Sequence, residues 1–173
     1  TFTDLTGDLG GTVDASVIGL PDIRALILDC ALKDVSFTTG GLSSFVSPWT
    51  GGSLDLGRFA PHEAFRLDAT AQGTIADLAA RLGISSTGAG AADASIRVRN
   101  LTRTQPVAIN GTVSTDNLNI GKFIGKDFIK ECTLDTEVSA TLAKGNPTAI
   151  IDTLNVSRLN VLDYDYTRIR AAG

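Results

Sequence analysis

Apolar and polar residues alternate along most of the chain, which is the pattern of β-strands with one face buried and the other in water. The clearest run covers residues 65–72, in which Phe, Leu and Ala alternate with Arg, Asp, Thr and Gln. Similar runs occur at residues 13–17, 26–32, 94–99, 107–109, 134–140 and 150–161. The pattern predicts roughly nine or ten strands joined by short turns.

The alternation is interrupted at several places. After Asp34 the apolar phase moves by one residue to Val35 and Phe37, which predicts a β-bulge or a break in the strand. The pair Asn110-Gly111 and the segment around Pro147 predict turns. Residues 39–57 are rich in Gly, Ser and Thr around Trp49, and we expect an irregular connection there.

One segment has helical spacing. Ile75, Leu78, Ala79 and Leu82 follow a Thr74/Asp77 pair typical of a helix N-terminus, and Gly83 stands at the expected end. We therefore expect a short helix over residues 74–82.

Composition favours an open architecture over a compact one. The chain has 43% hydrophobic but only 6% aromatic residues, and its alternating positions are mostly small aliphatic side chains. We predict an all-β fold, an elongated, curled and mostly antiparallel sheet with one short helix. Because the chain starts at Thr1 and contains no Met, we expect residues 1–173 to be a single segment of a larger protein.

Charge argues against nucleic acid as a partner. The net charge is −4 and the Lys and Arg residues are scattered, whereas phosphate binding needs a basic face. No apolar run approaches the roughly 20 residues needed to cross a bilayer as a helix.

Residues with reactive side chains do not fall into catalytic or metal-binding patterns. His62 has no nucleophile motif beside it, and Asp163 and Asp165 lack the spacing of a calcium loop. Cys30 and Cys132 are too far apart in sequence for a zinc or redox motif; buried thiols and a long-range disulfide both remain possible. We expect no catalysis, no metal and no cofactor.

Residues 111–142 resemble a recurring segment of the bacterial TamB/AsmA-like proteins. In that family a strand ending in D-x-L-N-[IL]-G precedes a K-x-[IL]-G unit and another long strand. The matching residues are Asp116, Leu118, Asn119, Ile120 and Gly121, then Lys122, Ile124 and Gly125, then Leu134 to Leu142. Residues 156–173 and, more loosely, 13–37 and 65–78 are similar to other repeats of the family.

This resemblance implies a periplasmic segment of a protein that is anchored in the inner membrane and reaches the outer membrane. It implies roles in phospholipid transport and in outer-membrane protein assembly. The implied partners are phospholipid acyl chains or unfolded outer-membrane proteins, and an outer-membrane barrel protein of the Omp85 type.

The candidate site is the apolar side of the alternating strands. These residues would either line a hydrophobic groove for lipid or fill an ordinary protein core, and the sequence leaves both open. They are Leu28, Cys30, Leu67, Ala69, Ile96, Val98, Ile109, Leu134, Val138, Val156 and Val161.

Two other classes of protein also fit the sequence. A secreted β-sandwich adhesin or carbohydrate-binding module would present an aromatic platform around Trp49. An enzyme on a right-handed β-helix would require carboxylates clustered at a cleft.

Overall fold

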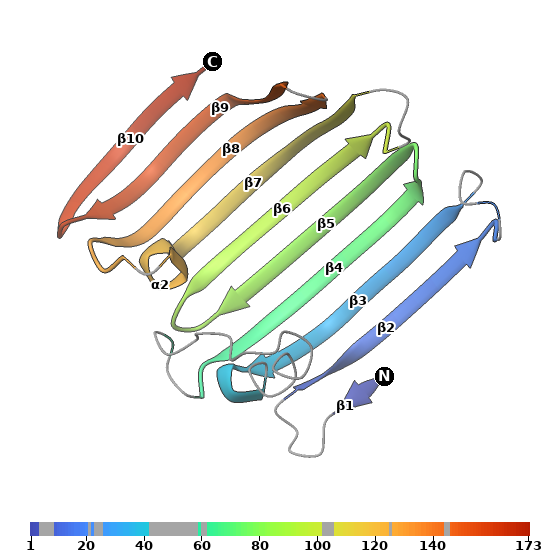
Figure 1. Ribbon diagram of the computed structural model, residues 1–173. Coiled ribbons are helices and arrows are strands. Elements are labelled where there is room, and N and C mark those ends of the chain that lie inside the picture. The colour runs from blue at the N-terminus through green and yellow to red at the C-terminus, as the bar shows by residue number, and fades with distance from the viewer. Residues whose placement is uncertain are drawn as a thin grey trace.

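The computed structural model describes residues 1–3, 9–20, 22, 26–41, 59, 62–101, 106–124, 126–143 and 146–173. In this part of the chain ten strands form one antiparallel sheet in which each strand pairs with its neighbours in sequence (Figure 1). The strands are β1 (Phe2–Thr3), β2 (Leu9–Ile18), β3 (Ile27–Thr38), β4 (Ala64–Thr74), β5 (Asp77–Ser86), β6 (Gly90–Arg99), β7 (Val107–Asn119), β8 (Ile129–Ala143), β9 (Asn146–Val161) and β10 (Tyr164–Ala172). The predicted all-β, curled antiparallel sheet is confirmed.

The sheet is open and covers little of its own surface. The accessible surface is 11390 Å², whereas a compact protein of this mass exposes about 8000 Å². In Figure 1 the strands lie in a single twisted layer. Most side chains on both faces of the sheet therefore keep contact with solvent.

The helix predicted over residues 74–82 is wrong. Thr74 and Asp77 face each other across a tight hairpin between β4 and β5, with Ile75 and Ala76 at its turn. The hydroxyl oxygen of Thr74 does accept a hydrogen bond from the amide of Asp77, at 3.2 Å. The same hydrogen bond occurs in helix caps and in turns. Because β5 pairs with β4 across this segment, the hydrogen bond here belongs to a turn.

Of the bulge or break predicted after Asp34, the structure has the bulge, within the continuous strand β3. The β3–β4 register shifts between Leu32 and Val35, and Asp34 has a positive φ of 51°. Its amide donates a hydrogen bond to Oδ1 of Asp68 at 2.8 Å. The bulge keeps Val35 on the same face of the sheet as Leu32, despite the change of phase in the sequence.

The turn predicted at Asn110-Gly111 is wrong, because both residues lie inside the continuous strand β7. Gly111 is opposite Ile96 on β6 and Val138 on β8. A glycine in the middle of a strand often marks a place where a neighbouring chain approaches closely, and Gly111 occupies such a place.

Helical structure occurs at other positions than the one expected. Residues 39–41 are helical, and α2 (Ile120–Ile124) follows β7 directly. The side-chain oxygen of Asn119 accepts a hydrogen bond from the amide of Lys122 at 3.1 Å, which starts α2. A β-carbon at Gly121 would clash with the carbonyl oxygens of Lys126 and Ile129, so the close fold of this segment requires glycine.

Candidate functional site: the apolar face of the sheet

All eleven candidate residues lie on one face of the sheet, which we call the apolar face. Strand register places them there, because residues paired across adjacent strands project to the same side. One row of cross-strand partners runs from β3 to β7. Its members are Leu28, Gly73, Leu78, Val98 and Ile109. The apolar alternation of distant segments therefore forms continuous rows that cross the strands.

Three further rows run beside this one. The first joins Cys30, Ala71, Ala80, Ile96, Gly111 and Val138. The second joins Leu32, Ala69, Leu82, Ala94 and Val113. The third joins Leu67, Ile84, Ala92, Thr115, Leu134 and Val156.

Val161 lies farther from the others, at the end of β9. It pairs with Ile129 on β8 and Tyr164 on β10. The apolar face thus extends to the last strand, where Tyr166 and Ile169 pair with Leu159 and Val156.

Much of this face is open to solvent. At its centre Leu82 is 44% and Ile96 38% exposed, and toward β2 Val13 is 49% exposed. On β9 Ile151, the partner of Val138, is 55% exposed. Monomeric soluble proteins rarely leave so continuous an apolar surface uncovered, and where they do it marks an interaction site.

The apolar face is closed at one end by an aromatic cluster. Phe37 and Phe65 stack with ring centroids 5.3 Å apart, and Phe59 contacts Phe65 edge-on at 5.4 Å. Phe123 of α2 adds a further edge contact to Phe59 at 5.1 Å. Phe37, Phe59 and Phe65, together with Leu9, Val35 and Ala89, are most of the buried hydrophobic side chains of the described chain.

A charged pair holds α2 against this cluster. The Glu63 side chain is 4% exposed; its Oε2 lies 3.5 Å from Nζ of Lys122, and its Oε1 accepts a hydrogen bond of 2.5 Å from the Ser86 hydroxyl. Lys122 Nζ also donates a hydrogen bond to the carbonyl oxygen of Gly88 at 2.7 Å. We call this arrangement the Glu63–Lys122 clasp; it joins α2 to β4 and to the β5–β6 turn.

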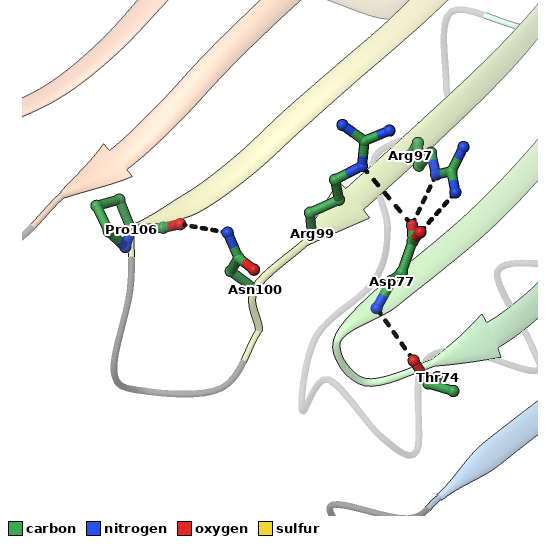
Figure 2. Close-up of polar contacts among 6 residues, drawn as sticks. All are labelled: Thr74, Asp77, Arg97, Arg99, Asn100 and Pro106. Atoms are coloured by element: carbon green, nitrogen blue, oxygen red, sulfur yellow. Dashed lines mark hydrogen bonds and ion pairs between the residues drawn. The ribbon is translucent and has the colours of Figure 1, made fainter.

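The opposite, polar face carries the charged residues. In Figure 2 the Asp77 carboxylate accepts hydrogen bonds from Arg97, with Nε 2.6 Å from Oδ1, and lies 4.0 Å from Nε of Arg99. The hydrogen bond from Arg97, together with the two positive charges, holds the pKa of Asp77 below its usual 3.8. These residues tie β5 to β6 at the end of the sheet that lies away from the aromatic cluster.

Beside them the polar face has a shallow hollow of about 430 Å³, whose lining includes Asp68, Arg81 and Asp93. No aromatic side chain lines it. It therefore lacks the stacking platform that a sugar-binding surface would use.

The residues with reactive side chains are dispersed. His62 is exposed in the turn before β4, and Asp163, in the β9–β10 turn, pairs with Lys130. Asp165 lies in β10, where hydrogen bonds from Asn160 and Arg158 lower the pKa of its carboxyl. In the described ranges no group of three or more His, Cys, Asp or Glu side chains is placed to hold a metal ion.

The two cysteines are free thiols, so the long-range disulfide is wrong. Cys132 is 1% exposed beneath the bulge of β7, where its carbonyl oxygen accepts a hydrogen bond from the Thr115 hydroxyl at 3.0 Å. Cys30 is half-buried on the apolar face.

Sequence reasoning missed several residues of the apolar face. Leu78, Ala80 and Leu82 belong to it although their segment has the spacing that predicts a helix, and Gly111 belongs to it although the pair Asn110-Gly111 predicts a turn. Period-two alternation at residues 78, 80, 82 and 84 was the signal that identifies this strand. Trp49 lies outside the described residues.

Comparison of this chain with protein-family models, with curated proteins and with solved structures finds no match. Among the described residues, no helix has the length and apolar character needed to cross a membrane.

Proposed function

We propose that this chain is a non-catalytic apolar surface of a larger bacterial envelope protein. In this proposal it lies in the periplasm and shelters phospholipid acyl chains, or apolar segments of unfolded outer-membrane proteins, from water. The resemblance to the TamB/AsmA-like family supplies the setting, including transport toward an outer-membrane barrel protein. The chemistry of the apolar face supplies the ligand class.

One observation carries the proposal: the apolar face continues across the sheet from β2 to β10 while large side chains at its centre remain exposed. An ordinary core would bury these residues against a second layer. Here the buried hydrophobic side chains gather around the aromatic cluster at one end. Among the described strands no second sheet covers the remainder of the face, which in this proposal contacts an apolar ligand.

The side chains of this surface suit a ligand without specific polar groups. The row that contains Cys30 and Ile96 consists largely of small residues and is bordered by Leu28, Leu82 and other larger ones. Each methylene transferred from water to such a surface gains about 0.8 kcal/mol, so an acyl chain can be held without directional contacts. Weak, non-directional contacts also allow a ligand to move along the sheet.

A β-sandwich adhesin or carbohydrate-binding module is less well supported. A sandwich needs a second sheet packed on the first, and the described strands form one sheet.

The proposal is tested by two neighbouring substitutions on β6. Ile96 projects from the apolar face and Ser95 from the polar face, and both are exposed. Ile96→Asp and Ser95→Asp add the same charge to opposite faces of the same strand. The measurement is binding of a fluorescent phospholipid, after thermal melting has shown that both variants are folded.

We expect Ile96→Asp to weaken lipid binding at least about tenfold, because an acyl chain would have to desolvate a carboxylate. Ser95→Asp should bind lipid like the unsubstituted protein. Equal binding by all three proteins, or equal loss in both variants, would refute an apolar-face site.

A further inference from the structure

Large apolar side chains are exposed in the turns at the end of the sheet where β8 begins and β9 meets β10. They belong to Phe123 and Ile124 of α2, to Phe128 in the turn before β8 and to Leu162 in the β9–β10 turn, and their exposed fractions are 47%, 54%, 47% and 66%. In Figure 1 α2 lies at this end, beside the start of β8. Turns are usually built from small and polar residues. We call these four residues the end patch.

Backbone hydrogen bonds join the segments that carry the end patch. The amide of Leu162 donates a hydrogen bond to the carbonyl oxygen of Phe128 at 2.8 Å. The amide of Lys126 donates one to the carbonyl oxygen of Gly121 at 2.9 Å, which folds the chain after α2 back onto the helix. The four apolar side chains therefore start from one connected part of the backbone.

Leu162 has a backbone conformation that suits other residues better. Val161 pairs with Tyr164, and the two residues between them, Leu162 and Asp163, have positive φ of 52° and 65°. Two-residue hairpin turns of this kind favour asparagine and glycine, because a bulky side chain strains a positive φ. The described residues leave the leucine side chain largely exposed, so internal packing does not account for it. Strain of this kind is concentrated at functional sites, which indicates that Leu162 makes a contact outside the fold.

The charged residues beside the end patch are mostly basic, although the chain has a net charge of −4. Within residues 120–130 they are Lys122, Lys126, Asp127 and Lys130. Glu63 pairs with the first of these lysines and Asp163 with the last, whereas the amine of Lys126 has no ion pair within the described chain. Exposed aromatic and aliphatic side chains bordered by lysines are typical of segments that insert into a bilayer interface, where lysines reach lipid phosphates.

We propose that the end patch inserts into the interface of a phospholipid bilayer. Its apolar side chains lie among the outer parts of the acyl chains, and Lys126 lies at the phosphates. The patch consists of turns at the end of the sheet, and a bilayer interface receives such turns without a complementary pocket. This inference concerns where the protein meets a membrane. It holds or fails independently of lipid binding on the apolar face.

The test measures flotation of the protein with vesicles of phosphatidylcholine and phosphatidylglycerol. Leu162→Asn removes the apolar side chain and supplies a residue suited to positive φ, whereas Leu162→Met retains an apolar side chain. Leu20→Asn is the matched control, because Leu20 is a 69% exposed leucine in the β2–β3 connection, at the opposite end of the sheet. Ile96→Asp separates the end patch from the apolar face.

We expect Leu162→Asn to bind vesicles at least about tenfold more weakly than the unsubstituted protein, since transfer of a leucine side chain out of water contributes at least that factor. Leu162→Met, Leu20→Asn and Ile96→Asp should bind like the unsubstituted protein. Leu162→Asn should melt no lower than the unsubstituted protein, because asparagine relieves strain at this turn. Its loss of binding would then not come from unfolding.

Phe128→Ser gives a second measurement that does not depend on the β9–β10 turn, and it should also weaken vesicle binding. Four results would overturn the proposal. They are no flotation of the unsubstituted protein, equal flotation of Leu162→Asn and Leu162→Met, an equal loss in Leu20→Asn and Leu162→Asn, and a loss of flotation in Ile96→Asp.

Discussion

Gly111 lies directly opposite Ile96, and a β-carbon at Gly111 would come within 3.3 Å of Cγ1 of Ile96 and 2.7 Å of the carbonyl oxygen of Ser95. We expect Gly111→Ala to lower the free energy of unfolding by about 1–3 kcal/mol, because the backbone of β6 would have to move. Urea denaturation measures this loss.

Gly83→Ala is the matched control. A β-carbon there would meet Oδ1 of Asp93, the end of a movable side chain, at 2.9 Å. Gly83→Ala should lower the free energy of unfolding by no more than about 0.5 kcal/mol. Equal costs for the two variants would mean that the close approach at Gly111 does not constrain the sheet.

Alternation in the sequence was sufficient to place most of the candidate residues on one face, because register between strands preserves the period of two. Val156 and Val161 are five residues apart in β9, and only a register shift that skips Ser157 puts both on the apolar face. Alternation failed at residues 74–82, where Leu78 and Leu82 satisfy both the helical and the strand period. It also failed at Asn110-Gly111. This pair is common in turns, but here it lies inside a strand, where Gly111 allows β6 to approach closely. The aromatic cluster could not be predicted, since long-range pairing alone brings Phe37, Phe65 and Phe123 to the same end.

The Glu63–Lys122 clasp should contribute to stability. Lys122→Met removes the cation from a carboxylate that is 4% exposed, and we expect a loss of about 1–3 kcal/mol in chemical denaturation. Lys130→Met breaks an ion pair whose partners are 50% and 80% exposed, and should change stability by less than about 1 kcal/mol. A larger effect at Lys130 than at Lys122 would contradict the clasp.

The two thiols should react at different rates. Burial raises the pKa of the Cys132 thiol above its usual 9.0, partly offset by the hydrogen bond with Thr115, so reactive thiolate is scarce. We expect a maleimide to label Cys30 in the native protein and Cys132 only after unfolding. Mass spectrometry over time distinguishes the two sites, and equally rapid native labelling would show that Cys132 is not buried.

Acid should reduce the contribution of Asp77 to the stability of the folded protein. The hydrogen bond from Arg97 lowers the pKa of this carboxyl from 3.8. A carboxyl whose pKa is lower in the folded than in the unfolded protein stabilises the fold at a pH above its pKa in the unfolded protein. This stabilisation disappears as the pH falls through the pKa of the folded protein. The unsubstituted protein should therefore melt slightly higher than Asp77→Asn at about pH 6. The difference should fade below pH 3.8, and a difference that grows on acidification would contradict the assignment.

The central claim, that the apolar face contacts acyl chains, is tested most directly by photo-crosslinking at two adjacent residues of β5. Leu82 projects from the apolar face and Arg81 from the polar face. A photoreactive amino acid is placed at either position, and the protein is irradiated with phospholipid vesicles. Mass spectrometry should find phospholipid attached at position 82 and little or none at position 81; equal attachment at both positions, or none at 82, would contradict the account.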